Sequence, residues 1–332
     1  MDRLQELQAW LASVLPDPAL RIEPASADAS FRRYFRAHVD KDSWIVMDAP
    51  PQHEDCRPFI KVAELMAEAG LNVPRVIARD LDRGFLLLTD LGTTTYLQSL
   101  QQDRSLLDDL MPQAIRALVK WQTTSRENVL PPYSEALLRR ELDLFPEWYL
   151  QRHCGLSLTD SCLDGMETTF STLTATILSQ ARVYVHRDFM PRNLMRSNPE
   201  PGVLDFQDAV LGPISYDIAS LMRDAFISWQ ENEVIDMTVR YWEEARRASL
   251  PVPGDFSEFY RDVEWMGMQR HLKVLGIFAR LKHRDGKTGY VEDTPRFLGY
   301  LRATASRYGA LSGLLPLLDR IEERTVTGGL TF

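Results

Sequence analysis

The spacing of apolar residues separates a strand-rich first quarter of the chain from a helical remainder. Apolar residues at every third or fourth position predict one helix over residues 4–14 and another over residues 55–69. Pro16 and Gly70 follow these segments, and both residue types are common where helices end. The first helix has early acidic residues and no long apolar core, so we do not expect it to be a signal peptide.

Alternating polar and apolar residues predict strands between and after these helices. Residues 31–39 alternate in this way and therefore present different side chains on the two faces of a strand. One face carries Phe35, Ala37 and Val39, and the other carries Tyr34, Arg36 and His38. Further strands are predicted at residues 21–23, 43–47, 73–76 and 84–88.

From residue 96 onward the helical pattern dominates, and proline-rich segments interrupt it. Helices are predicted at about residues 103–124, 134–152, 160–180, 215–228, 231–249, 255–283, 293–307 and 310–323. Strands followed by helices favour an α+β protein with two lobes and a site in the cleft between them.

Two short apolar runs stand apart from the helical pattern and bracket a polar turn. They are Val183–Val185 and Val203–Leu204, and we predict that they form the two strands of a small hairpin. The turn between them carries His186, Asp188 and Asn193. The side chains with candidate chemistry therefore gather in one loop.

The order His-Arg-Asp, four residues, Asn, and then Asp-Phe is the set that protein kinases use for phosphoryl transfer. In such a set, Asp188 would accept the proton of an attacking hydroxyl. Asn193 and Asp205 offer the hard oxygen ligands that Mg²⁺ prefers, and Asp208 is a weaker third candidate. We therefore expect ATP and Mg²⁺ as cofactors, with His186 in a structural role.

Asp and Asn also build ordinary turns, so a polar loop without catalytic chemistry is the alternative interpretation. The spacing of the set, and a second acidic pair after an apolar strand, favour phosphoryl transfer instead. The chain has Asp205-Phe206-Gln207 where protein kinases have Asp-Phe-Gly, which disfavours a protein kinase.

In a kinase fold, the turn that ends at Ser30 would cover the ATP phosphates, with Ser30 as a hydrogen-bond donor. The following strand would usually carry a Lys that holds the phosphates, but Met47 stands there. We expect Arg32 or Arg33 to supply the missing cation. The alternative is that both arginines only face solvent.

A polar turn after residues 84–88 would form the hinge, where backbone groups bond adenine. Its candidate nucleotide-binding residues are Thr89, Asp90 and Leu91. We place the hinge at about residues 89–95, between an N-terminal nucleotide-binding lobe (residues 1–91) and a helical catalytic and substrate lobe (residues 96–332).

Charge and cysteine content exclude several classes of partner. The chain has 38 basic and 47 acidic residues, a net charge of −9, which argues against nucleic-acid and membrane-surface binding. It has no run of about 18 apolar residues, so we expect no membrane span. Cys56, Cys154 and Cys162 lack paired spacing and indicate reduced thiols. We expect a cytoplasmic monomer.

The segment after the catalytic loop resembles one branch of the kinase-like enzymes. Residues 212–219, Gly-Pro-Ile-Ser-Tyr-Asp-Ile-Ala, together with Leu204-Asp205-Phe206, are similar to aminoglycoside phosphotransferases and choline kinases. The resemblance implies the protein-kinase-like, two-lobed form of the α+β class. It also implies a structural role for Asp217, which would bond the catalytic loop from the first turn of a helix.

Four separated stretches resemble one subgroup, the bacterial anomeric kinases for N-acetylmuramate and N-acetylglucosamine that serve peptidoglycan recycling. The stretches are residues 28–36, 46–51, 141–149 and 269–281. The resemblance extends from about residue 20 to about residue 300 and implies an ATP-dependent kinase that makes a sugar 1-phosphate. Met47 in place of Lys also fits that subgroup.

The charge of the acceptor gives a separate criterion. Aminoglycosides and choline are cations, whereas N-acetylmuramate carries a lactyl carboxylate that needs a cation or N–H donors. Residues 270–287 hold six Lys and Arg residues against the single acid Asp285, although a solvated basic face is an equal alternative. The candidate residues for the amino-sugar substrate are Glu147, Trp148, Arg270, Lys273 and Arg280.

Two other functions stay open at this point. One is a small-molecule kinase for a cationic acceptor such as an aminoglycoside or choline. The other is a catalytically silent nucleotide-binding scaffold, which the missing Lys would explain. ATP turnover separates the scaffold from both enzymes, and the charge of the acceptor separates the two enzymes.

Overall fold

The computed structural model describes residues 2–27 and 31–328. The chain forms two compact units, and each unit is assembled from two separate parts of the sequence. The first unit comprises Met1–Thr124 and His186–Ala209, and the second comprises Ser125–Val185 and Val210–Phe332. The lobe boundary at residues 89–95 stays a prediction, whereas the first compact unit continues to Thr124.

The first unit is built on a five-stranded antiparallel sheet with the strand order β1-β2-β3-β5-β4. The strands are β1 (Arg21–Ala27), β2 (Arg33–Val39), β3 (Asp42–Asp48), β4 (Val76–Asp80) and β5 (Phe85–Thr89). The strand predicted at residues 73–76 begins only at Val76, because Pro74 has no N–H to join a ladder.

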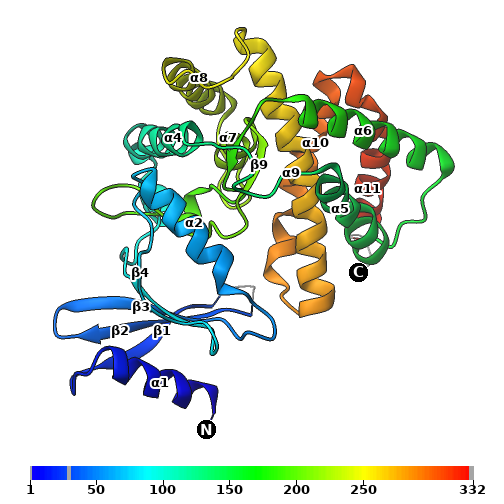
Figure 1. Cartoon of the computed structure of the whole chain (residues 1–332). Helices are drawn as coiled ribbons and strands as arrows, with labels where there is room; N and C mark the ends of the chain where they lie inside the picture. The colour runs from blue at the N-terminus through cyan, green and yellow to red at the C-terminus, as the bar shows by residue number, and fades with distance from the viewer. Residues whose placement is uncertain (1, 28–30, 329–332) are drawn as a thin grey trace. The chain divides into compact units, whose positions relative to one another are not determined.

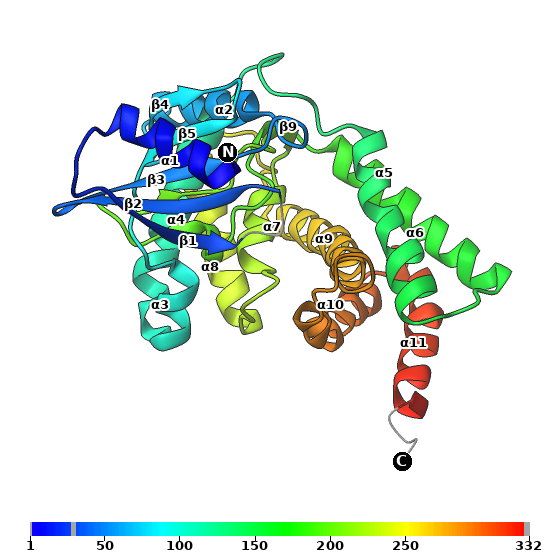
Figure 2. The ribbon, with the colours of Figure 1, turned by 90° about the horizontal axis from the view of Figure 1, so that it is seen from below.

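Helix α1 (Arg3–Val14) covers one face of this sheet (Figures 1 and 2). Asp2 caps its first turn by accepting a hydrogen bond from the Gln5 N–H at 2.9 Å. The buried core between helix and sheet consists of Leu7, Trp10, Leu11, Ala37, Val46, Phe85 and Leu87. Burial of each large side chain contributes roughly 1.5–3 kcal/mol, so this face holds the helix in place.

Helix α2 (Cys56–Glu68) lies on the side of the sheet opposite to α1 (Figure 1). Asp55 caps it by accepting from the Arg57 N–H at 2.9 Å, and Gly70 follows it with a left-handed φ of +75°. The unit also contains α3 (Tyr96–Gln102), η1 (Arg104–Leu106), α4 (Leu107–Thr123), η3 (Pro191–Asn193), β7 (Leu194–Met195) and β8 (Gly202–Val203).

The predicted pairing of residues 183–185 with residues 203–204 is wrong. Val203 of β8 pairs with Leu194 of β7, immediately after the catalytic loop. The strand before the loop, β6 (Arg182–Val185), pairs instead with β9 (Val210–Pro213). The short apolar pair Leu194-Met195 gives residues 202–203 a partner that is much closer in the sequence.

The second unit is mainly helical and is organised around α9 (Phe256–Asp285), which begins at the Asp255 cap and ends at Gly286. Figure 2 shows α10 (Thr294–Arg307) alongside α9. The other elements are α5 (Glu135–Leu144), η2 (Phe145–His153), α6 (Asp160–Ser179), α7 (Tyr216–Met222), α8 (Glu231–Arg247), η4 (Gly289–Asp293), α10 (Thr294–Arg307), η5 (Gly309–Leu314) and α11 (Leu315–Gly328). No helix in the described ranges has both the length and the apolar character needed to span a bilayer.

Several predicted helices are divided or shortened. The segments 103–124 and 310–323 each begin with a short 3-10 helix, η1 and η5. The segment 134–152 changes at Phe145 from an α-helix to the π-helix η2, in which the Cys154 N–H donates to the Tyr149 carbonyl at 2.8 Å. Helix α7 stops at Met222, because the Asp224 carboxylate accepts the N–H groups of the following turn.

Gly276 brings α9 into contact with the end of α5, directly before the π-helix η2 begins. A Cβ atom at Gly276 would lie 2.4 Å from the Leu144 carbonyl carbon, so a larger residue would separate the two helices. Two of the stretches that suggested the amino-sugar kinases, residues 141–149 and 269–281, therefore pack against each other.

Candidate active site

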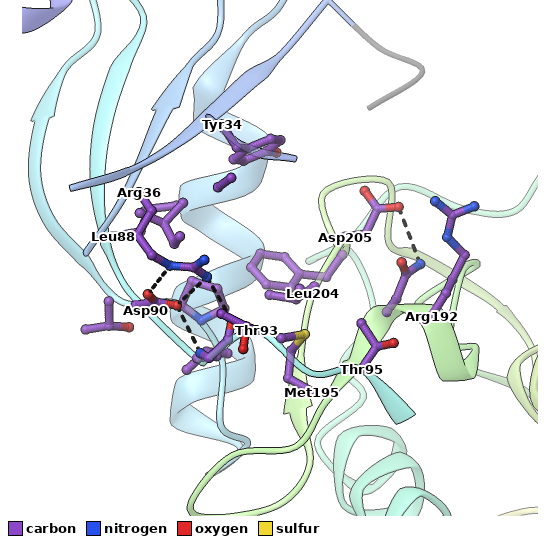
Figure 3. Close-up of a pocket in the computed structure, with 18 of the residues that line it drawn as sticks. Tyr34, Arg36, Leu88, Asp90, Thr93, Thr95, Arg192, Met195, Leu204 and Asp205 are labelled. Atoms are coloured by element: carbon purple, nitrogen blue, oxygen red, sulfur yellow. Dashed lines mark hydrogen bonds and ion pairs between the residues drawn. The ribbon is translucent and has the colours of Figure 1, made fainter. Parts of the chain in front are cut away.

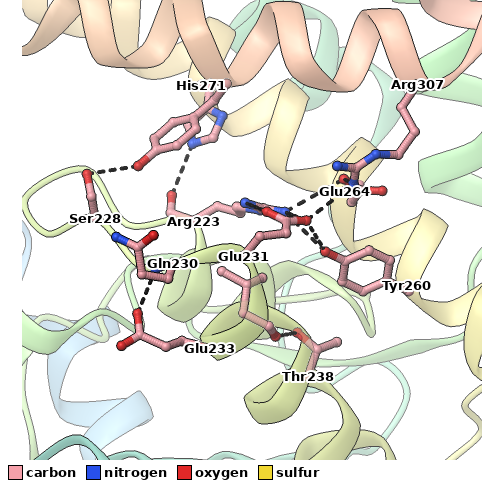
Figure 4. A network of polar contacts seen from close by, with 12 residues as sticks. Arg223, Ser228, Gln230, Glu231, Glu233, Thr238, Tyr260, Glu264, His271 and Arg307 are labelled. Atoms are coloured by element: carbon pink, nitrogen blue, oxygen red, sulfur yellow. Dashed lines mark hydrogen bonds and ion pairs between the residues drawn. The ribbon is translucent and has the colours of Figure 1, made fainter.

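A cavity of about 390 Å³ lies within the first unit. Figure 3 shows that residues of the sheet, the hinge turn and the loop around residues 192–206 enclose it. Its walls include Tyr34, Arg36, Ile45, Phe59, Leu88, Thr89, Asp90, Leu91, Arg192, Asn193, Met195, Leu204 and Asp205. The cavity thus brings together the predicted metal ligands Asn193 and Asp205 with all three predicted hinge residues.

Asn193 and Asp205 face each other at one end of the cavity. The Asn193 amide nitrogen donates to the Asp188 carbonyl at 2.9 Å and lies 3.4 Å from Asp205 Oδ2. Because the nitrogen of the amide is held in this way, its oxygen is directed elsewhere and makes no hydrogen bond with any described residue. An amide oxygen and a carboxylate on neighbouring segments form a donor set that fits Mg²⁺.

The backbone at this site adopts an unusual conformation. Asp205 has a φ of +63° and Arg187 has a φ of +77°, and neither residue is glycine. Such conformations cost of order 1–3 kcal/mol and concentrate at functional sites. Gln207 steadies the Asp205 carboxylate by donating to Oδ1 at 2.9 Å, and Phe206 anchors the segment against Phe59 of α2 with the ring centroids 4.9 Å apart.

His186 is fully buried at the start of the loop that carries Asp188. Its ring stands edge-on to Phe189, and Nδ1 accepts the backbone N–H of Asp188 at 3.3 Å. Burial lowers the pKa of His186 to about 4, so the imidazole is neutral at pH 7. The structural role of His186 stays a prediction.

The Asp188 carboxylate is half-buried and makes no hydrogen bond or ion pair with any side chain or backbone group that the structure describes. A carboxylate with unused acceptor positions is available to a hydroxyl group. Asp208 is exposed and lies outside the walls of the cavity, and its carbonyl accepts from Arg187 at 3.4 Å.

The hinge residue Asp90 is tied to two strands of the sheet. Arg36 of β2 binds its carboxylate through Nε at 2.6 Å and Nη2 at 3.2 Å. Ser43 and the Gly92 N–H also donate to it, at 2.8 and 2.9 Å. Burial opposes charge on this carboxylate, but the hydrogen bond from Arg36 and the other donors outweigh burial and lower the pKa of Asp90.

The predicted phosphate-binding cations lie away from the walls of the cavity. Arg33 is on the α1 side of β2, where its Nε donates at 2.9 Å to Asp48, and Arg3 binds the same buried carboxylate. Arg32 lies 3.6 Å from Glu54. Contact of either arginine with a phosphate stays a prediction, and Ser30 lies outside the described residues.

Met47 occupies the position of the usual Lys, on the cavity side of the sheet, and is 1% exposed. Its partner across the ladder is Tyr34, which lines the cavity. Among the described residues, the cationic side chains that line the cavity are Arg36 and Arg192, and the sequence analysis assigned neither of them to the nucleotide site. The alternation of β2 placed Arg36 beside Tyr34, and Arg192 directly precedes the predicted ligand Asn193.

In the second unit, Glu141 of α5 is the centre of a buried polar cluster. Lys273 of α9 lies 2.9 Å from its carboxylate, and the Tyr133 hydroxyl donates to it at 2.6 Å. Lys273 also donates to the Tyr216 hydroxyl at 3.2 Å, and the Arg270 guanidinium stacks 4.9 Å from the Tyr216 ring centroid. The basic run therefore points partly inward, since Arg270 is only 4% exposed.

The other predicted substrate residues form a separate group near η2. Trp148 is 9% exposed, with the Arg152 guanidinium 3.9 Å from its ring centroid, and Arg152 also pairs with the exposed Glu147 at 3.3 Å. Arg280 is half-buried, and its Nε has no hydrogen-bond partner in the described part of the chain. Burial first, and then the neighbouring Arg284, lower the pKa of Arg280. Asp217 is fully buried in the first turn of α7, and its structural role stays a prediction.

The comparisons with known proteins agree with this geometry. Residues 21–252 match the phosphotransferase enzyme family. The chain belongs to this family. It is 51% identical to the N-acetylmuramate/N-acetylglucosamine kinase of Pseudomonas aeruginosa over 97% of both chains.

Solved structures with low sequence identity share the fold. The ADP-bound aminoglycoside phosphotransferase APH(2'')-Ib has a TM-score of 0.61 at 15% identity, with 89% of this chain and 97% of that chain covered. Choline kinase from Streptococcus pneumoniae has a TM-score of 0.63 at 14% identity, with 90% and 99% covered. The prediction of an α+β, protein-kinase-like fold is confirmed, and so is the resemblance to these two groups of phosphotransferases.

Proposed function

We propose that this phosphotransferase uses ATP to phosphorylate the anomeric hydroxyl of N-acetylmuramate and N-acetylglucosamine. The products would be the sugar 1-phosphates, for use in peptidoglycan recycling in the cytoplasm. The observation that carries the proposal is the cavity that joins the hinge to Asn193 and Asp205. It occurs in a chain that is 51% identical, over nearly its whole length, to a kinase for these two amino sugars.

Asp188 is the proposed acceptor-side base. As the sugar O1 forms its bond to the γ-phosphorus, the bond from that phosphorus to the bridging oxygen breaks, and ADP leaves. The O1 proton passes to the Asp188 carboxylate. An anomeric hydroxyl is more acidic than the other sugar hydroxyls, so a carboxylate can take this proton as the new bond forms.

Asn193 and Asp205 are the proposed ligands of Mg²⁺, with exposed Asp208 as a weaker candidate. The metal would offset the negative charge of the phosphates when bound there. The donor set supports this assignment, because Gln207 and the Asp188 carbonyl orient the two ligands without occupying the Asn193 oxygen. Backbone groups of Thr89, Asp90 and Leu91 would bond the base at the hinge.

Three arginines are candidates for the cation that contacts the phosphates. Arg192 adjoins the proposed metal ligands and lines the cavity (Figure 3), which supports it most directly. Arg32 and Arg33 remain proposed contacts, although Arg33 would have to leave the buried Asp48 to reach a phosphate.

Five residues of the second unit are proposed to contact the sugar. They are Glu147, Trp148, Arg270, Lys273 and Arg280. Arg280 is the best supported reader of a lactyl carboxylate, because its Nε is unpaired within the described ranges, whereas Lys273 is already paired with Glu141.

The test is ³¹P NMR of the products from a panel of free sugars with Mg-ATP. We expect sugar 1-phosphates from N-acetylmuramate and N-acetylglucosamine, and no product from their methyl glycosides, which are blocked at O1 and free at O6. A 6-phosphate, or turnover of a methyl glycoside, would refute the anomeric assignment. Turnover of aminoglycosides or choline alone would indicate a kinase for cationic acceptors, and no turnover would indicate a silent scaffold.

A further inference from the structure

We propose that Arg36 is a positioning residue for the nucleoside part of the nucleotide, and that Asp90 holds it in place. The inference rests on the proposed use of a nucleotide as phosphate donor. It assigns the Arg36 guanidinium to the base and ribose, whereas the cation that kinases usually place in this sheet acts on the phosphates.

The first argument is the position of Arg36 in the cavity. In Figure 3, Arg36 and Asp90 lie at one end, and Asp205 and Arg192 lie at the other. Phosphates belong beside the proposed metal ligands. The base and ribose must therefore lie toward the hinge, where Arg36 is.

The second argument is the fixed orientation of the guanidinium. Its Nε and Nη2 are held by the Asp90 carboxylate, and Nη2 also donates to the Gly92 carbonyl at 3.0 Å. The two side chains are only 15% and 7% exposed, so water competes weakly for these bonds. A guanidinium held along one edge keeps its plane and its remaining donors in a defined direction.

The third argument is that Asp90 has no acceptor capacity left for a ligand. Its two oxygens receive four hydrogen bonds, two from Arg36, one from Ser43 and one from the Gly92 N–H. A carboxylate has about four acceptor positions. Asp90 therefore acts through Arg36 and the hinge turn, and its side chain does not read the base.

The Nη1 atom of Arg36 makes no hydrogen bond with any described residue. Its two N–H groups are available to a ribose hydroxyl or to a base nitrogen. Arg36 also stands opposite Ile45 in the ladder, and both side chains line the same wall of the cavity. A purine against this wall would meet the planar guanidinium, a contact that arginine favours.

The experiment measures calorimetric binding of adenosine, ADP and ATP to the full chain and to Arg36→Met. We expect the affinities for all three ligands to fall by a similar factor, on the order of 10- to 100-fold. The reason is that the lost contacts are made to the nucleoside, which all three ligands share. Arg192→Met is the matched control at the other end of the cavity. It should lower the affinity for ATP more than the affinity for adenosine.

Two further variants separate positioning from folding. Asp90→Asn keeps the shape of the side chain and should also lower the affinity for adenosine. The double variant Asp90→Asn/Arg36→Met should lose little further affinity. Arg36→Lys keeps the charge but cannot make both hydrogen bonds to Asp90. Its affinity for adenosine should therefore lie between those of Arg36→Met and the wild type. Thermal melting of each variant without ligand shows whether the variant is folded.

Three outcomes overturn the inference. Wild-type affinity of folded Arg36→Met for adenosine would remove Arg36 from the nucleoside site. If Arg36→Met lowers the affinity for ATP but leaves the affinity for adenosine unchanged, Arg36 contacts the phosphates instead. Independent, additive losses from Arg36→Met and Asp90→Asn would show that Asp90 does not act through Arg36. If the wild-type chain binds no nucleotide, the proposed function fails, which is a different result.

Discussion

The side-chain amide of Asn193 lies 3.4 Å from the carboxylate of Asp205, although twelve positions separate them in the sequence. The β7–β8 hairpin produces this proximity, because Leu194 directly follows Asn193 and pairs with Val203, two residues before Asp205. A backbone hydrogen bond from the Leu204 N–H to the Asn193 carbonyl, at 2.9 Å, extends the pairing to the ligands themselves. The proposed metal site is therefore a product of strand register.

Asp188→Asn should lower kcat by roughly 10²–10⁴-fold, the usual contribution of a positioned general base. The substitution keeps the shape of the side chain and removes its ability to take a proton. ADP affinity, measured by calorimetry, should change little, because Asp188 is assigned to the acceptor. Near-normal turnover would show that another group takes the proton.

Asp205→Gly should abolish activity at ordinary Mg²⁺ concentrations and leave the apo protein as stable as before, or more stable. Glycine tolerates the left-handed φ of +63°, which costs other residues roughly 1–2 kcal/mol. Activity as a function of Mg²⁺, together with urea unfolding, tests both parts. Retained activity at low Mg²⁺ would argue against a ligand role.

Arg33→Met should lower the free energy of unfolding by roughly 1–2 kcal/mol, because the buried Asp48 carboxylate loses one of two charged partners. Its effect on the KM for ATP should be smaller than that of Arg192→Met, and Arg32→Met completes the comparison. A large rise in the ATP KM with unchanged stability would restore Arg33 as the phosphate cation.

If Arg280 binds the lactyl carboxylate, Arg280→Glu should lower kcat/KM for N-acetylmuramate more than for N-acetylglucosamine. Loss of one charge-assisted hydrogen bond should separate the two sugars by about 1.5–3 kcal/mol in kcat/KM. Arg284→Glu is the matched control, since Arg284 is exposed and already paired with Asp285 at 2.7 Å. Equal losses for both sugars would leave Arg280 as part of a solvated basic face.

The stability of the protein should fall as the pH is lowered from about 6.5 toward 4, in part because of His186. The unfolded chain takes up a proton at an ordinary histidine pKa of about 6.5, whereas the native His186 has a pKa of about 4. Below pH 6.5 the unfolded state therefore binds more protons, and each further pH unit costs up to about 1.4 kcal/mol.

His186→Gln should reduce this slope, which urea unfolding at several pH values measures. His53→Gln, at an exposed position, controls for the loss of one histidine. An unchanged slope in His186→Gln would show that His186 does not cause it.

The fold class and the proximity of Asn193 and Asp205 were predictable because they depend on local pattern, whereas the roles of Asp188, Asn193 and Asp205 stay predictions. Alternation in β2 correctly separated the core residue Ala37 from Tyr34 and Arg36, which line the cavity. The spacing of Asp188, Asn193 and Asp205 depends on one loop and one hairpin.

The contacts between distant segments were not predictable from such patterns. The identity of Arg33 suggested a phosphate cation, but the structure pairs it with Asp48, fifteen residues away. Arg36 gained its position at the hinge from Asp90, fifty-four residues away. Lys273 was predicted as a substrate residue from a run of charge, whereas its nearest partner Glu141 lies on another helix. Pairings of this kind depend on tertiary packing, which spacing and composition do not reveal.

The π-helix η2 makes this region sensitive to changes in chain length. A wide turn holds one residue more than an α-helical turn, so deletion of a single residue would let the segment return to α-helical winding. An inserted residue could not be absorbed in this way, so it would rotate the residues that follow by about 100° and remove their contacts with α9, including the pairing of His153 with His283 at 3.2 Å. Homologues should therefore tolerate a one-residue deletion in η2 better than a one-residue insertion.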